Sequence, residues 1–436
     1  MSTDELRYQI GFGNAFATEA VEGALPRTQN SPRQAPFGLF AEQINGTGFT
    51  VHRAENRRVW LYRLRPQNLD QHFRPRPVGR FVGDFSEAVP SPEVMRFKPV
   101  TMPTQPTDFL DGLVTFGGVG SALTRNGAAF HVFAANKDMD DVAFSNIDGD
   151  LLLAPQLGRL RVRTELGWLE AGTGQILIIP RGIRFQVFLP DGQARGFVAE
   201  LFDAHFMLPE RGLFGANSLA DERHFLAPVA SYENRAEPYT IVVRQGGRLF
   251  EIDSPHSPFD VVAWHGNYAP FMYDLRNFNS LGSVSWDHPD PSIYTVLTSP
   301  MDTRGRNAID VGVFLGRWDV AEHTFRPPYF HRNSAVEFNM VLQSPHDTGP
   351  WQAGTFSYTP YLTPHGVSTG SYKHNVNMDD ADADKPSRGA DDSIWLQFES
   401  TYLVKVMPWM FDHPDRDEGY LKSFSTYQPG ELAAAE

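Results

Sequence analysis

The sequence predicts an all-β protein built of β-sandwiches or β-barrels, with few short helices. Short runs of β-branched and aromatic residues recur along the chain, for example at residues 58–64, 128–133 and 240–243. Between these runs lie 37 glycines and 33 prolines, scattered in the manner of turn residues. Aromatic residues make up 13% of the chain, and large flat side chains suit the space between sheets. Long stretches with a helical period are scarce, so alternating strands and helices, and with them a nicotinamide-binding fold, are not expected.

The composition restricts the size of the protein and its chemistry. A chain of 436 residues predicts two or three domains. The chain has no cysteine, which excludes disulfides, thiolate metal sites, iron–sulfur clusters and a cysteine nucleophile, so a metal would need His, Asp or Glu ligands. A net charge of −14 argues against a nucleic-acid partner. The polar N-terminus and the lack of any apolar run of ~18 residues predict a cytoplasmic protein with no membrane partner.

A strand–turn–strand pattern in the first half of the chain resembles the second conserved motif of the cupins. Gly174, Pro180 and Gly182 occupy its turn positions, and Phe185 stands where a metal-binding histidine is usual. The resemblance implies a small β-barrel that has lost its metal. The alternative is an ordinary pair of strands joined by the Pro-Arg-Gly turn.

Three further segments carry structural expectations. Residues 117–120 are glycine-rich but lack dinucleotide-binding spacing, so they are expected to form a glycine turn. Residues 379–392 are acidic and poor in apolar side chains, which predicts a solvated loop. Residues 394–399, directly after it, are expected to form a strand.

The richest candidate for metal chemistry lies at residues 327–338. His331 and Glu337 are six residues apart, an even spacing that puts both side chains on one face if the segment is a strand. His365, from a neighbouring strand, completes a set of two histidines and one carboxylate, which suits non-haem Fe(II) because it leaves adjacent coordination positions open. The alternative is a chance spacing among 14 histidines, with His331 at the edge of a proline-rich turn.

A second cluster, at residues 286–292, contains His288 between prolines. His288 is a candidate general base on a loop, with Asp287 or Asp290 orienting its ring. The alternative is a turn with capping aspartates, which the spacing alone favours.

The pattern Gly-x-Ser-x-Gly at residues 366–370 matches a hydrolase nucleophile elbow. That motif requires a helix after the serine, and residues 371–375 are not expected to be helical. A serine hydrolase is therefore not expected.

The sequence as a whole resembles the homogentisate 1,2-dioxygenase family, the ring-cleaving enzymes of tyrosine and phenylalanine catabolism. The similarity extends over nearly the whole chain in the same order. The segments that carry it are residues 8–14, 23–26, 29–32, 38–43, 58–63, 215–220, 264–268, 287–293 and 326–333. So many ordered matches are more specific than any single motif.

The resemblance implies a bicupin-like architecture and a set of site residues. A larger N-terminal β domain with the degenerate cupin-like motif would span residues 1–275, and a cupin-like catalytic domain would span residues 276–436, with a hexamer as the assembly. Fe(II) would be bound by His331, Glu337 and His365, and His288 would be the acid/base residue. The substrate-binding residues would be Tyr329, Asn333, His365 and His346, of which Asn333 shares the strand parity of the metal ligands.

The resemblance also implies the reaction. Homogentisate would bind the iron through a ring hydroxyl and its acetate group, and His288 would accept a ring proton. Oxygen would then open the ring between C1 and C2 to give maleylacetoacetate. Because the protein carries a net charge of −14, an anionic substrate also needs local positive charge from the metal and from a basic residue that the sequence does not identify.

The sequence departs from the family in the segment between Glu337 and His365. The family carries Gly-x-Tyr-x-Ala-Lys where this chain has residues 344–349, with His346 at the tyrosine position. A family histidine is replaced by Thr359. These differences leave open a related dioxygenase for a gentisate-like hydroquinone. A metal-binding cupin without oxygenase activity and a scaffold bicupin are further alternatives, which the complete ligand set disfavours.

Overall fold

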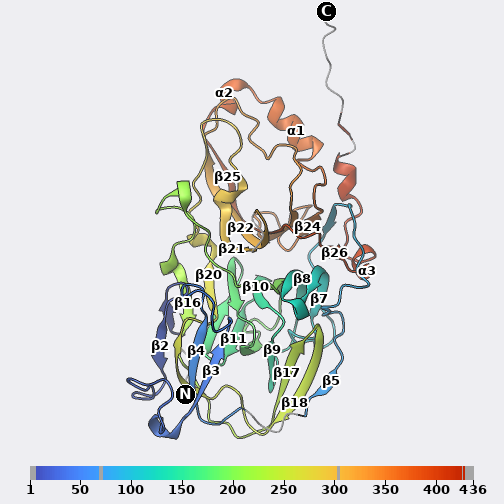
Figure 1. The fold of residues 1–436 in the computed structure, drawn as a ribbon. Coiled ribbons are helices and arrows are strands. Elements are labelled where there is room, and N and C mark those ends of the chain that lie inside the picture. The colour runs from blue at the N-terminus through green and yellow to red at the C-terminus, as the bar shows by residue number, and fades with distance from the viewer. Residues whose placement is uncertain (1–5, 68–71, 302–304, 425, 428–436) are drawn as a thin grey trace, which may run out of the picture.

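The computed structural model describes residues 6–67, 72–301, 305–424 and 426–427. Within this part of the chain, four β-sheets account for most of the regular structure (Figure 1). The α-helices described are short: α1 (Thr369–Val376), α2 (Asp380–Ala383) and α3 (Pro408–Phe411). The predicted all-β class is therefore confirmed.

The largest sheet has nine antiparallel strands and is buried on both faces. Along one of its inner strands, Leu151 and Leu153 pack into one hydrophobic core, while Leu152 and Ala154 pack into another. This alternation follows from the two-residue period of a strand, and it makes this sheet the central layer. Its strands, in spatial order, are β1 (Tyr8–Ile10), β16 (Phe225–Pro228), β20 (Phe271–Asp274), β13 (Gln175–Ile179), β10 (Asp150–Leu157), β15 (Ala194–Leu201), β8 (Asn126–Ala135), β7 (Leu113–Ser121) and β26 (Lys405–Val406).

Two sheets cover the first face of the central layer. Phe185 is fully buried in their common core, 5.4 Å from Phe144, so the cupin-motif position that usually binds metal packs here as a core side chain. The seven-stranded sheet has the order β12 (Gly167–Ala171), β11 (Leu160–Thr164), β14 (Arg184–Phe188), β9 (Val142–Asn146), β17 (Tyr239–Gln245), β18 (Arg248–Ser254) and β5 (Arg74–Arg76). The four-stranded sheet has the order β2 (Phe16–Glu19), β19 (Val261–Gly266), β4 (Arg58–Arg63) and β3 (Phe40–Asn45).

A six-stranded antiparallel sheet packs on the second face. Phe130 of the central sheet and Phe338 of the six-stranded sheet stack with ring centroids 4.2 Å apart. The strand order is β21 (Thr295–Pro300), β22 (Asn307–Asp319), β25 (Ser387–Ser400), β23 (Val336–Gln343), β24 (Phe356–Thr359) and β6 (Met95–Phe97). The other face of the six-stranded sheet points away from the central sheet and is available to line a cavity.

The two halves of the chain exchange strands. β6 comes from the first hundred residues, yet it pairs with β24 at the edge of the six-stranded sheet. In return, β26 comes from near the C-terminus and pairs with β7 in the central sheet. Each half therefore completes a sheet of the other.

The glycine turn predicted at residues 117–120 was wrong, because these residues lie inside β7. A Cβ atom on Gly117 would lie 2.2 Å from the carbonyl oxygen of Lys405, so glycine allows the close approach of β26. Gly120 has a φ of +81°, which only glycine adopts without strain.

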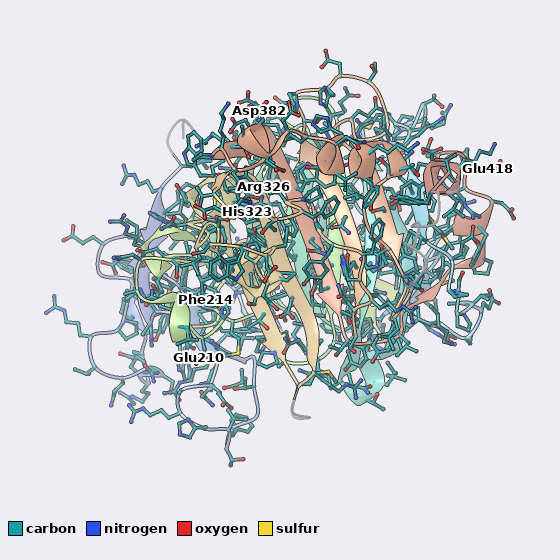
Figure 2. The ribbon with its side chains drawn as sticks, turned by 90° about the horizontal axis from the view of Figure 1, so that it is seen from above. Glu210, Phe214, His323, Arg326, Asp382 and Glu418 are labelled. Atoms are coloured by element: carbon teal, nitrogen blue, oxygen red, sulfur yellow. The ribbon has the colours of Figure 1, made fainter. Side chains whose placement is uncertain are left out.

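Two loop predictions near the C-terminus were also wrong. Residues 371–375 belong to α1, whose N-cap is Ser368; the Ser368 hydroxyl accepts a hydrogen bond from the Ser371 amide, and no strand leads into it, so the nucleophile elbow is still incomplete. The acidic segment 379–392 is mostly exposed, as predicted, but it contains α2 and the start of β25. Figure 2 places Asp382 of α2 near His323 and Arg326, and beside it Asp384 pairs with His323 at 2.9 Å. In the described residues, no helix has the length and apolar character needed to span a membrane.

Candidate metal centre and its cavity

His331, Glu337 and His365 lie together at one end of the six-stranded sheet. Their nearest ligand atoms all lie within 4.8 Å of one another. His365 Nε2 is 3.2 Å from Glu337 Oε1, and His331 Nε2 is 3.8 Å from the same oxygen. Three ligand atoms around one small space are the arrangement that a single metal ion requires.

Backbone carbonyls orient both histidine rings. His331 Nδ1 donates to the carbonyl of Tyr329 at 2.6 Å, and His365 Nδ1 donates to the carbonyl of Thr363 at 2.9 Å. Because a carbonyl only accepts, the proton of each neutral ring is on Nδ1 and the lone pair is on Nε2. His365 Nε2 is buried and lacks a hydrogen-bond partner. Two nitrogen lone pairs and a carboxylate oxygen facing one space fit a bound cation.

The carboxylate of Glu337 accepts hydrogen bonds from two side-chain amides. Asn333 Nδ2 donates to Oε1, and Asn339 Nδ2 donates to Oε2 at 3.3 Å. Burial alone would raise the pKa of the Glu337 carboxyl, but the neighbouring side chains of His331 and His365 hold that pKa well below its ordinary value. The residue is therefore an anionic candidate ligand in a mostly buried position.

The strand argument used for this cluster was wrong, although the structure does bring the three residues together. β23 begins at Val336, so the segment from His331 to Ala335 is not a continuous strand. Instead, His331 and His365 form an isolated antiparallel bridge, in which each amide donates to the other carbonyl at 3.0 and 3.1 Å. Directly opposed residues of an antiparallel pair project to the same side, so this bridge sets both rings beside Glu337.

His288 lies on the wall of the same cavity. Its Nδ1 donates to the carbonyl of Pro289 at 2.9 Å, which leaves Nε2 of the neutral ring as a proton acceptor. Burial lowers the pKa of His288 below its usual value, so the neutral form is favoured. Neither aspartate suggested from the sequence orients it: Asp290 instead caps the turn at Ser292, as the alternative interpretation predicted. The ring centroid of Tyr329 lies 6.0 Å from that of His288 and 5.7 Å from that of His331.

The cavity has a volume of about 430 Å³ and its floor is the outer face of the six-stranded sheet. Along β25 the residues alternate: Ile394, Leu396 and Phe398 face the core. Trp395, Gln397 and Glu399 face the cavity. Glu399 is the cross-strand partner of Glu337, so the acidic end of the floor lies at the metal centre.

The other end of the floor is aromatic. Trp395 lies about 14 Å along the strand from Glu399, since each residue of a strand rises ~3.4 Å. Phe314 is its cross-strand partner. The ring centroid of Trp351 lies 5.0 Å from that of Trp395 and 6.0 Å from that of Tyr420. These three rings and that of Phe314 line the cavity. A planar ring entering the cavity therefore meets apolar faces at this end and charged groups at the other.

Burial and the charges of Glu337 and Asp310 raise the pKa of Glu399 to about 8. The second carboxyl beside the metal ligand is thus favoured in its protonated form at neutral pH. As an acid it donates a hydrogen bond, which a deprotonated group cannot do.

One sequence-predicted residue is not part of the cavity. His346 lies beyond the end of β23, its side chain is exposed, and it does not line the cavity. The sequence reasoning missed Arg317, Trp351, Trp395 and Glu399. For Trp395 and Glu399 a pattern was available, because the predicted strand at residues 394–399 alternates between apolar core residues and other types.

Two family models and a curated relative match nearly the whole length of this chain. Models of the homogentisate 1,2-dioxygenase N-terminal and C-terminal regions match residues 7–275 and 276–430. A homogentisate 1,2-dioxygenase from Oryza sativa subsp. japonica is 44% identical over 449 residues, covering 99% of this chain and 95% of the rice protein. Among solved structures, protein Ylba from E. coli has a TM-score of 0.30 at 8% identity, over 74% of this chain and 96% of its own. A Cupin 2 conserved barrel domain protein from Leptotrichia buccalis has a TM-score of 0.28 at 9% identity, over 70% of this chain and 91% of its own. The two family matches together cover nearly every residue, and the chain belongs to the homogentisate 1,2-dioxygenase family.

Proposed function

We propose that this protein is an Fe(II)-dependent dioxygenase that opens the ring of homogentisate with O2 to give maleylacetoacetate. The observation that carries the proposal is the cluster of His331, Glu337 and His365, whose ligand atoms converge at one end of a cavity that His288 also lines. Family membership supports the same reaction class. Two nitrogens and one carboxylate are the donor set that non-haem Fe(II) oxygenases use.

Fe(II) held by His331, Glu337 and His365 would supply the redox chemistry that activates O2. The protein side chains supply proton handling and orientation. His288, with Nε2 unprotonated, accepts the proton of a ring hydroxyl. Asn333 and Asn339 orient the carboxylate of Glu337 through hydrogen bonds to its two oxygens.

The segment that departs from the family pattern contributes to this cavity. Thr359 and Trp351 both line it. Gentisate, whose carboxylate is attached directly to the ring, is therefore a second candidate substrate.

The test is an oxygen-uptake assay on protein purified and loaded with Fe(II) under anaerobic conditions. We expect uptake and a yellow ring-fission product with homogentisate. Uptake with gentisate alone would identify gentisate as the substrate in place of homogentisate. No uptake with either acid would contradict the proposal. His288→Gln should lower kcat by about 10²–10⁴-fold, since general-base catalysis contributes that much.

A further inference from the structure

We infer that Arg317 binds the carboxylate of the substrate, the group that the family resemblance had placed on the iron. This inference rests on the proposed ring cleavage, since the hydroquinone acids considered there carry a carboxylate beside the ring. It identifies the basic residue that the sequence left open.

Arg317 is the one Lys or Arg among the described residues that line the cavity. Two acidic side chains, Asp290 and Glu337, line the same space beside Glu399, which favours its protonated form. The protein as a whole has a net charge of −14. An organic anion is therefore repelled by its surroundings unless a cation faces it, and among the lining side chains Arg317 is that cation.

The guanidinium of Arg317 has no acidic partner. Nη1 donates to the carbonyl of Leu315 at 3.3 Å, and Cζ lies 4.7 Å from the ring centroid of Tyr294. Across the described residues no carboxylate lies within 4 Å of it; Asp319, two residues further on, faces Arg326 at 3.6 Å. A planar guanidinium with free N–H groups binds a carboxylate through two parallel hydrogen bonds.

The pairing of β22 with β25 is interrupted next to Arg317. In β22, Val311 and Val313 face the core, so a regular strand would point residue 317 to the core as well. Between Leu315 and Arg317 the paired position on β25 moves from Ile394 to Gly389, so the extra residues of this bulge lie in β25. Arg317 departs from the regular alternation at this interruption and lines the cavity together with Phe314.

The support beneath the guanidinium is rigid and lies near the proposed base. Tyr294 is 1% exposed, so the ring under Arg317 is held by the core. His288 lies close enough that, after burial, the charge of Arg317 contributes to lowering the pKa of His288. A carboxylate bound at Arg317 would therefore place the attached ring beside His288.

The test compares an acid with its neutral analogue. Arg317→Met and Arg317→Lys are loaded with Fe(II), and KM and kcat are measured for homogentisate and for 2,5-dihydroxyphenylacetamide. For Arg317→Met we expect KM for the acid to rise about 10- to 100-fold, the usual loss for a charge-assisted hydrogen bond, with kcat little changed because the contact is present before and during the reaction. KM for the amide should change less than about threefold. Arg317→Lys should lie between Met and the wild type, since one ammonium cannot form the paired bonds.

Arg388→Met is the matched control, because Arg388 belongs to the strand paired with β22 and carries the same charge but does not line the cavity. It should leave both KM values unchanged. An unchanged KM for the acid in Arg317→Met overturns the inference, and so does an equal loss for acid and amide, which is what packing on Tyr294 alone would cause. Calorimetric titration of the anaerobic Fe(II) protein with 2-hydroxyphenylacetate should show the same Arg317-dependent loss of affinity. If wild-type protein binds this acid through Arg317 but does not turn over homogentisate, the proposed reaction fails while the carboxylate site stands.

Discussion

At the residue scale, one or two hydrogen bonds orient each candidate ligand of the metal centre. One backbone carbonyl fixes each histidine ring, and two side-chain amides fix the carboxylate of Glu337. The sequence predicted the three candidate ligands through their residue types and through the family resemblance. It could not predict that Pro289, rather than an aspartate, supplies the partner of His288, because that contact depends on the local path of the loop.

Replacing Glu337 with glutamine should remove most of the metal affinity. The Glu337→Gln variant keeps the size of the side chain but loses the charge that faces two histidine nitrogens. We expect affinity to fall by more than ~100-fold, the upper value for residues that only support ligands. Metal content after dialysis against graded chelator, measured by elemental analysis, checks this; Glu322→Gln, an exposed control, should retain full metal. Full metal content in the Glu337 variant would remove this residue from the ligand set.

At the element scale, the aromatic end of the cavity is held by a residue from another part of the chain. Arg96 belongs to β6, the strand contributed by the N-terminal half. Its Cζ lies 5.1 Å from the ring centroid of Trp351 and 4.3 Å from that of Tyr420, and its Nη2 pairs with Asp417 at 2.5 Å. The strand exchange thus also positions the cavity wall.

Arg96→Met should loosen this wall. The change removes two cation–π contacts and leaves Asp417 without its partner, which should cost about 2–4 kcal/mol of unfolding free energy. Denaturant unfolding measures the loss, and Lys98→Met, an exposed neighbour, should change stability by less than ~0.5 kcal/mol. Equal stability of the two variants would mean that the aromatic rings support one another without Arg96.

The element boundaries also mark where sequence patterns reach their limit. The sequence predicted the strand at residues 394–399, and its alternation of apolar and other residues indicates the face on which Trp395 lies, although that face was not predicted. The same rule fails for Arg317, which departs from the regular alternation where the pairing of β22 with β25 is interrupted. The glycine-turn prediction fails for residues 117–120, because these glycines allow β26 to pack closely and do not form a turn.

At the scale of the whole molecule, a buried charge cluster ties the central sheet to the seven-stranded sheet. Glu200 of β15, His131 of β8 and Arg244 of β17 are fully or almost fully buried, and Glu200 contacts both of the others. Burial alone would raise the pKa of Glu200, but Arg244 and His131 lower it to about 2. Burial lowers the pKa of His131.

These shifts predict that the protein loses stability in acid. A carboxyl with a depressed pKa in the folded state stabilises the fold above its unfolded pKa of ~4.5 and loses that contribution as the pH falls toward about 2. A histidine with a depressed pKa adds a loss that begins below pH ~6.5. Glu200→Gln should be less stable than the wild type at pH 7, and the gap should shrink by ~3 kcal/mol between pH 5 and pH 2. Urea unfolding across this range checks the slope; a constant gap would contradict it.

The exchange of β6 and β26 predicts that the two halves do not fold separately. Residues 276–436 alone lack β6, and residues 1–275 alone lack β26 and expose the apolar face on which Phe338 packs. We expect neither fragment to unfold cooperatively, whereas co-expressed fragments should form a complex that binds metal. Calorimetry of each fragment tests this, and a cooperative transition in residues 276–436 alone would show that β6 is dispensable.

The sequence by itself determined the β class, because alternation is a local property, and its resemblance to the family predicted the three candidate ligands and the candidate base. The tertiary structure decided which strands complete each sheet, that His346 lies outside the cavity, and that Arg317, Trp351 and Glu399 lie inside it. These outcomes depend on register, on one bulge and on contacts between segments hundreds of residues apart. Packing free energy selects among such arrangements, and it is a property of the assembled sheets and not of any one segment.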